Sequence, residues 1–311
     1  MFSKTAALTL ACACLCGAAA HAAPYRFSTI DYPGADYTFA FGINDGGQIV
    51  GRAGNGSPDS GVATGYLRNT DGSFVPIAVS GAPFTEAFGV NNAGEIVGWS
   101  SDAQELGFIR RTDGMIESVA AAGHAITILL AINNAGVSVG IAGDEAGGEL
   151  ALVRSSIGEF SFFAPPGAQI TEAYGINDIG EIVGFFVDDA GEHGFRRLAD
   201  GTISPFDYPG ADGSGLLGLN DTGWYAGFFE DGSGVHGFVW DGVSSPFALD
   251  VPGATATVAL GINDSLQVVG YYFDAQGAQH GFVANAVPLP GSLALLSIGA
   301  IALARRSIGR L

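Results

Sequence analysis

The chain has 311 residues, of which 48% are hydrophobic and only 14% charged, with a formal net charge of −19. Such an apolar chain, rich in Gly, Val, Ile and Phe, is not intrinsically disordered. Its negative charge repels nucleic acid and anionic membranes. Composition therefore excludes a disordered or nucleic-acid-binding protein and leaves a globular one.

The first 22 residues have the pattern of a secretory signal peptide. Lys4 gives a positive start, residues 6–15 are apolar, and Ala20-His21-Ala22 is a cleavage pattern of small residues. We expect signal peptidase to leave a mature chain beginning at Ala23. The segment also contains every cysteine of the chain, at Cys12, Cys14 and Cys16. The mature protein therefore forms no disulfide. Lipid attachment at one of these cysteines is the alternative.

The body, residues 24–286, is periodic. An asparagine recurs at intervals of 42 to 47 residues, at Asn44, Asn91, Asn133, Asn177, Asn220 and Asn263. A glycine follows each one seven residues later, at Gly51, Gly98, Gly140, Gly184, Gly227 and Gly270. Because this offset never varies, we infer six copies of one rigid unit.

The order of residues within one copy predicts four short strands. In the first copy, residues 38–43 and 48–52 alternate as strands around a tight Asn-Asp-Gly-Gly turn. The glycine three places after the asparagine suits a positive φ angle, and only Leu266 replaces it. A third strand follows at 65–68 and a fourth at 74–79. In the third copy, we align Leu150 with Gly65.

Four antiparallel strands per repeat are typical of a propeller blade. The sixth copy stops after its third strand, whereas residues 26–33 form an extra strand before the first copy. We therefore predict an all-β fold, a six-bladed β-propeller closed by the N-terminal strand joining the last blade. An open β-solenoid is the alternative.

The repeat also carries a family resemblance. An aromatic-Asp-Tyr-Pro-Gly-Ala segment, then Gly-Ile-Asn-Asp-x-Gly-x-Ile-Val-Gly, then His-Gly-Phe resembles the HAF-type extracellular repeat. The resemblance covers nearly the whole body. It implies a secreted bacterial protein and no defined activity.

The C-terminal residues 287–311 resemble a PEP-CTERM sorting signal. The short motif Val287-Pro288-Leu289-Pro290-Gly291 precedes an apolar segment, residues 292–304, and then Arg305, Arg306 and Arg310. Leu289 stands where that family usually has Glu. The resemblance implies an exosortase-type transpeptidase as partner, transient anchoring in the inner membrane, and final placement at the cell surface or matrix of a Gram-negative bacterium. A simple C-terminal membrane anchor is the alternative.

Several residues are candidates for sites, although none forms a complete motif. The acidic hairpin loops contain oxygen ligands that suit calcium, at Asp188, Asp189, Asp231 and Asp274.

His193, His236 and His280 recur at one position of the repeat, too far apart around a ring to share a metal. Ser138 sits in a Gly-x-Ser-x-Gly sequence inside a strand, without the strand-to-helix turn of a nucleophile elbow. We therefore predict no catalytic residue, no cofactor and no assigned metal site.

In several repeats, aromatic residues flank the glycine that lies seven places after the asparagine. They are Trp99, Trp224, Trp240, Phe185, Phe186, Phe228, Phe229, Tyr271 and Tyr272. Strand alternation buries one residue of each pair, and the other is free to pack between blades or stack on sugar rings. The sequence thus favours a non-catalytic surface or matrix protein with a structural or binding role. Extracellular polysaccharide is its candidate partner. The alternatives are a glycan-acting propeller enzyme and a calcium-dependent adhesion module.

Overall fold

The computed structural model describes residues 25–58, 62–101, 105–144 and 147–287. The predicted signal peptide, and the sorting segment from Pro288 onward, lie outside these residues. Within them the secondary structure is strand and turn, and no helix is long and apolar enough to cross a membrane.

The strands in chain order are β1 (Tyr25–Ile30), β2 (Tyr37–Ile43), β3 (Ile49–Gly54), β4 (Thr64–Arg68), β5 (Phe74–Ile77), β6 (Phe84–Val90), β7 (Ile96–Ser101), β8 (Glu105–Arg110), β9 (Ile116–Val119), β10 (Ile126–Ile132), β11 (Ser138–Gly143), β12 (Glu149–Arg154), β13 (Phe160–Phe163), β14 (Ile170–Ile176), β15 (Ile182–Asp188), β16 (Gly191–Arg197), β17 (Ile203–Phe206), β18 (Gly213–Leu219), β19 (Tyr225–Asp231), β20 (Gly234–Trp240), β21 (Phe247–Ala248), β22 (Ala256–Ile262), β23 (Val268–Phe273) and β24 (Gln279–Ala286).

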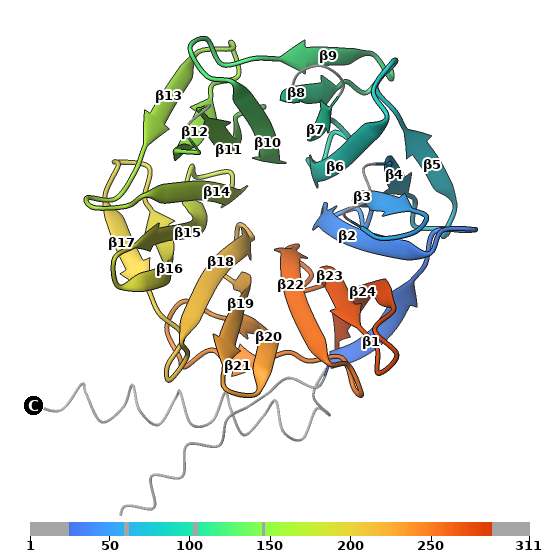
Figure 1. Ribbon diagram of the computed structural model, residues 1–311, viewed down its shortest axis with the longest axis vertical. Coiled ribbons are helices and arrows are strands. Elements are labelled where there is room, and N and C mark those ends of the chain that lie inside the picture. Colours follow the sequence, from blue (N-terminus) through green and yellow to red (C-terminus); the bar gives the residue numbers. More distant parts are fainter. Residues whose placement is uncertain (1–24, 59–61, 102–104, 145–146, 288–311) are drawn as a thin grey trace, which may run out of the picture.

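Strands of one repeat pair antiparallel with their sequence neighbours, for example in the order β2-β3-β4-β5. The groups surround a central axis, with β2, β6, β10, β14, β18 and β22 innermost (Figure 1). Strand β1 pairs with β24 and completes the sheet of β22 and β23. The predicted all-β, propeller-like architecture is confirmed.

Each innermost strand contains a β-bulge just before its turn. In β14, for example, the pairing with β15 jumps from Ala173 to Gly175, so that Tyr174 is left without a partner. A bulge bends the strand and redirects the side chain of the extra residue. The bulged residues are Phe41, Phe88, Leu130, Tyr174, Leu217 and Leu260.

The recurring asparagine does more than form its own turn. The Oδ1 atom of Asn133 accepts a hydrogen bond from the Val137 amide, 3.0 Å away, and its Nδ2 donates to the Asn177 carbonyl of the next repeat at 3.1 Å. Every repeat makes the second bond, and Asn263 makes it to the Asn44 carbonyl at 3.0 Å. The turn asparagine therefore ties each innermost strand to the next.

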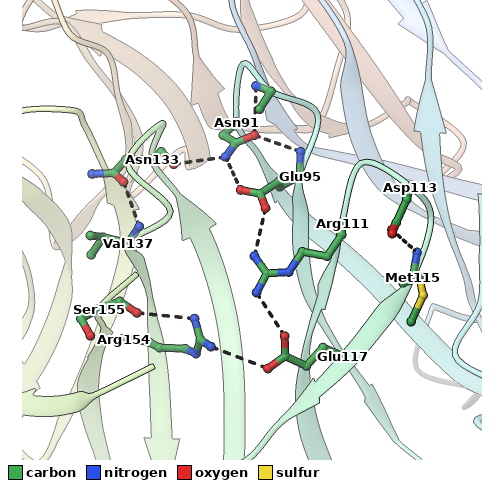
Figure 2. Close-up of polar contacts among 11 residues, drawn as sticks. Asn91, Glu95, Arg111, Asp113, Met115, Glu117, Asn133, Val137, Arg154 and Ser155 are labelled. Atoms are coloured by element: carbon green, nitrogen blue, oxygen red, sulfur yellow. Dashed lines mark hydrogen bonds and ion pairs between the residues drawn. The ribbon is translucent and has the colours of Figure 1, made fainter. Parts of the chain in front are cut away.

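Ion pairs add further ties between neighbouring repeats. Arg111 reaches Glu95 at 2.9 Å and Glu117 at 3.1 Å, and Arg154 of the following repeat lies 3.8 Å from Glu117 (Figure 2). The Arg154 side chain is buried, but that of Glu117 is 52% exposed, so solvent screens part of this attraction.

The glycine seven residues after each asparagine is required by a close backbone approach. A Cβ atom on Gly184 would lie 1.8 Å from the Glu172 carbonyl oxygen and 2.8 Å from the Phe195 ring. The same conflict arises at the other five glycines, which explains their fixed offset. At the turn, Leu266 adopts the positive φ angle, 58°, that glycine takes in the other repeats.

One alignment made from the sequence is wrong by a residue. Gly51 pairs with Tyr66 and Gly140 pairs with Leu152, so Ala151, not Leu150, is the counterpart of Gly65. Leu150 therefore occupies the histidine position of the later repeats. The Gly-Phe signal is missing in this copy, and sequence alone offered no marker of the register.

We expect Gly184→Ala to lower the free energy of unfolding by about 3–4 kcal/mol, because the methyl group meets backbone that cannot move aside. Gly232→Ala is the matched control, since a Cβ there meets nothing within 4 Å. Chemical denaturation of both variants measures the difference. Equal stabilities would show that the close approach does not constrain the fold.

Candidate active site in the central cavity

A cavity of about 470 Å³ lies on the axis at one end of the innermost strands. Its walls come from every repeat and are mainly aromatic or aliphatic, with one ion pair. The lining residues are Phe39, Phe41, Arg52, Glu86, Phe88, Leu130, Tyr174, Phe185, Leu217, Phe228, Val235, Val258, Leu260 and Tyr271. The bulged residues form its floor and continue into a narrow axial passage below.

The residue two places before each bulge decides how the walls differ. Alternation puts this residue on the same face as the bulged one, and at this position Phe39, Glu86 and Val258 line the cavity. In chain order the six positions hold Phe39, Glu86, Ile128, Glu172, Gly215 and Val258. Two carboxyl groups thus replace apolar residues in an otherwise repetitive scaffold, which makes the cavity chemically asymmetric.

The first carboxyl group, on Glu86, is ion-paired with Arg52 and accepts a hydrogen bond from the indole Nε1 of Trp99. Burial raises the pKa of Glu86, while Arg52 and Trp99 offset part of that rise. The Arg52 guanidinium also stacks 4.3 Å from the centre of the Phe39 ring. This side of the cavity holds a buried carboxylate beside a cation.

Among the residues that the structure describes, no cation is paired with the second carboxyl group, that of Glu172. It is hydrogen-bonded to the cavity-lining Tyr174 and to Glu149, and its strand neighbour Phe185 also lines the cavity. Burial, followed by the effect of Glu149, raises the pKa of Glu172 to about 8. Glu172 is therefore mostly protonated at neutral pH and can act as a proton donor.

The rim next to Glu172 is acidic. Glu149 and Glu192 both act on Glu172 through their negative charge, and Glu230 in turn raises the pKa of Glu192, after burial as the larger cause. These residues lie on β12, β16 and β19, at the ends next to the cavity-facing strands. An anionic ligand would meet repulsion on this side of the cavity.

The opposite end of the axis is lined by the turns. The recurring Asn44, Asn91, Asn133, Asn177, Asn220 and Asn263 are all buried there, around a hollow of about 80 Å³. Their hydrogen bonds are satisfied within the ring, and the amide of each following residue donates to the side chain of the next copy, as Asp178 does to Asp221 at 2.7 Å. We assign a structural role to these turns.

The predicted calcium candidates lie in separate hairpins. Asp188 and Asp231 accept hydrogen bonds from the backbone of their own turns, at Ala190 and Ser233. Asp274 does the same, and Asp189 binds Gln169 at 2.9 Å. In the described ranges no three acidic, histidine or cysteine side chains form a group that could hold a metal. Calcium binding stays a prediction.

The three histidines each bridge two carboxylates of their own surroundings. His193 Nδ1 lies 2.7 Å from Asp207 and its Nε2 lies 3.5 Å from Asp188. His236 and His280 repeat this arrangement, with Asp250 and Asp31 as the closer partners. The hydrogen bond to Asp207 raises the pKa of His193. These contacts join each hairpin to the loop that follows the outermost strand of the same sheet.

The aromatic pairs divide as strand alternation requires. Phe185, Phe228 and Tyr271 line the cavity, whereas Phe186 and Phe229 are buried between strands. The binding surface suggested by these aromatics therefore faces the axis. Ser138 is fully buried within β11.

Sequence reasoning missed Arg52, Glu86, Glu172 and Tyr174 as site residues. A signal was present, because aligning the six copies shows two glutamates at a position that is apolar or glycine elsewhere. The bulge that turns these side chains toward one cavity was not visible in the sequence.

No family model matches the sequence, and a comparison with curated proteins finds no match. Solved structures do share the fold. A gluconolactonase from Xanthomonas campestris is 14% identical with a TM-score of 0.54, covering 85% of this chain and 90% of its own. TolB from Acinetobacter baumannii is 13% identical with a TM-score of 0.54, covering 76% of this chain and 63% of its own. A mutant of AofleA from Arthrobotrys oligospora is 11% identical with a TM-score of 0.52, covering 85% and 91%.

The prediction of a non-catalytic structural or binding protein is wrong. It rested on loops that look alike from repeat to repeat, but the unlike residues lie on the inner strands. The fold is also shared with an enzyme, the gluconolactonase, so the architecture gives no reason to expect an inert scaffold. The expectation that the chain is not an enzyme loses its basis with it.

We expect Glu172→Gln to stabilise the protein at pH 8. The pKa of Glu172 is raised from 4.5 to about 8, so the unfolded chain loses its proton first and stability falls as pH rises through this window. Thermal melting between pH 4.5 and 8.5 should show a shallower fall for Glu172→Gln than for wild type. The exposed Glu159→Gln is the control, and an unchanged slope in Glu172→Gln would contradict the raised pKa.

Proposed function

We propose that the chain is a glycan-acting hydrolase whose active site is the central cavity. The observation that carries the proposal is an aromatic-lined cavity with two unlike acidic groups: Glu86 belongs to the lining, and Glu172 is hydrogen-bonded to the lining residue Tyr174. Glu86 is paired with Arg52, whereas Glu172 is protonated and bonded to Tyr174. Aromatic faces such as Phe39 and Tyr271 suit stacking against sugar rings, which have apolar faces of their own.

The two groups suit general acid and base roles. In the free site the Tyr174 hydroxyl donates its hydrogen bond to Glu172. In the reaction this hydroxyl turns to the glycosidic oxygen and gives it a proton as the bond from that oxygen to the anomeric carbon breaks, and the Tyr174 oxygen takes a proton from Glu172. The Glu86 carboxylate takes a proton from the water molecule whose oxygen bonds to the same carbon. Glu172 ends ionised and Glu86 protonated, and exchange with solvent restores both.

The proposal includes a closed ring of blades around the cavity. We infer six blades closed by β1 acting as the fourth strand of the last blade. Support comes from the β1–β24 pairing and from the Asn263 to Asn44 hydrogen bond, which joins the last copy to the first. A closed ring would hold the acidic groups of different repeats at fixed separations.

Export and sorting complete the proposal. The N-terminal residues 1–22 and the segment 287–311 support secretion by signal peptidase cleavage and processing by an exosortase-type enzyme, on a HAF-type repeat protein. The substrate would then be an extracellular or cell-surface polysaccharide. Intact mass measurement of the exported protein tests both cleavage sites.

Activity is expected to fall at least about 100-fold in Glu172→Gln, Glu86→Gln and Tyr174→Phe, as for loss of a general acid or base. The assay measures release of reducing ends from neutral and acidic polysaccharides. The wild-type rate should decline as pH passes about 8, where Glu172 ionises. Glu159→Gln, exposed and outside the cavity, serves as the control.

Release of reducing ends from no polysaccharide by the wild-type chain would refute the enzyme proposal. Wild-type activity that survives in all three cavity variants would place the reaction elsewhere on the molecule.

A further inference from the structure

The chain leaves its last strand at the end of the axis opposite the cavity. Strand β24 ends at Ala286, and the neighbouring Asn285 accepts a hydrogen bond at 2.8 Å from Gln267 of the Asn263 turn. In the first repeat, Gln48 of the Asn44 turn reaches Asn69, which follows β4, in the same way at 3.4 Å. The six asparagine turns and the turns after β4, β8, β12, β16 and β20 therefore share one end, which we call the turn face.

A short connection ties the apolar segment 292–304 to the turn face. Five residues, 287–291, separate this segment from Ala286. Even fully extended, five residues span only about 17 Å. The cavity end is one strand length away, and a strand of seven residues such as β22 is about 23 Å long. A lipid surface that takes up residues 292–304 therefore meets the turn face before it meets the cavity end.

The tips of the turns present apolar side chains that suit a lipid surface. The four most exposed large hydrophobic side chains of the described residues all lie on the turn face: Val243 is 91% exposed, Ile157 81%, Ile179 71% and Met115 68%. Single exposed apolar residues are ordinary on protein surfaces, but these four share one end of the molecule. Burial of such side chains at the boundary between headgroups and acyl chains favours membrane binding.

Arginine is concentrated on the same face. Of the arginines in residues 25–287, only Arg52 lies at the cavity end. The others lie at strand ends on the turn face: Arg26, Arg68, Arg110, Arg111, Arg154, Arg196 and Arg197. Guanidinium groups bind phosphate well, and their stems cover apolar surface. The carboxylates of Asp45, Asp178, Asp221 and Asp264 at the centre of the face repel anionic lipid, so a zwitterionic surface fits better.

We propose that the turn face docks on a zwitterionic lipid bilayer, with the tips Met115, Ile157 and Val243 inserted among the headgroups. This inference rests on the proposed sorting segment, whose apolar residues 292–304 enter the same bilayer, and it goes beyond the hydrolase. The cavity then opens away from the membrane, toward polymers outside it. Docking by the turn face therefore orients the cavity as well as holding the protein.

Single-cysteine labelling tests this placement, because the chain without residues 1–22 contains no cysteine. Ile157→Cys and Val243→Cys place an environment-sensitive fluorophore on the turn face. Val62→Cys is the matched control, since Val62 is 61% exposed but lies between β3 and β4 at the cavity end. Residues 23–311 are mixed with phosphatidylcholine vesicles, with and without lipid that carries a doxyl quencher. We expect blue-shifted, quenched emission from the labels at 157 and 243, and neither change from the label at 62.

Charged tips test the energetics of docking. The double variant Ile157→Asp, Val243→Asp should bind phosphatidylcholine vesicles at least about 10-fold more weakly than Val62→Asp does, because a carboxylate resists transfer from water. Equal binding by the two variants would overturn the docking.

Three results of the labelling experiment would also overturn it. They are an equal response from the label at 62, no response from 157 and 243 in vesicle-bound protein, and no binding of residues 23–311 to vesicles. A blue shift in the absence of vesicles would assign the turn face to residues 288–311 or to a second copy, and would equally overturn the lipid contact. Release of reducing ends is assayed without vesicles, so failure of the docking and failure of the hydrolase are distinguishable.

Discussion

The hydrogen bond from each turn asparagine to the carbonyl of the next repeat is the constraint on which the rest depends. It fixes the end of every innermost strand against its neighbour, as Asn177 does against Asn220. The strand just before each bulge then passes close over the glycine seven places after the asparagine, where a Cβ would meet the carbonyl oxygen of the residue two places before the bulged one. Together these contacts aim six bulged side chains at one axis, and the cavity is the consequence.

A repeated scaffold explains why the chemistry is concentrated on a few residues. Substituting one position in two copies is enough to place one carboxyl group, that of Glu86, in the cavity lining and a second, that of Glu172, on the lining residue Tyr174. Their environments then separate their roles, because Glu86 has Arg52 beside it and Glu172 has only Tyr174 and other carboxyl groups. Burial without a cation beside it destabilises the ionised form of a carboxyl group. The rest of the fold offsets this free-energy cost.

The periodic features of the fold were readable from the sequence because each reflects a local requirement. Asn44 and its counterparts recur because each forms the same tight turn. The glycine seven places later recurs because the strand before that turn passes close to it. The inner-strand glutamates were not recognised, because their importance depends on which face a bulge turns toward the axis. The third repeat was misaligned at Leu150 since its strand lacks the Gly-Phe pair that marks the others.

The measurement that most directly tests the central claim is a crystal structure of Glu172→Gln with a neutral oligosaccharide soaked in. A variant without the acid should hold uncleaved substrate. The account predicts a sugar ring inside the central cavity, stacked against the Phe39 or Tyr271 ring, with the glycosidic oxygen near Tyr174. A sugar bound only on the outer surface of the blades, with the cavity empty, would contradict it.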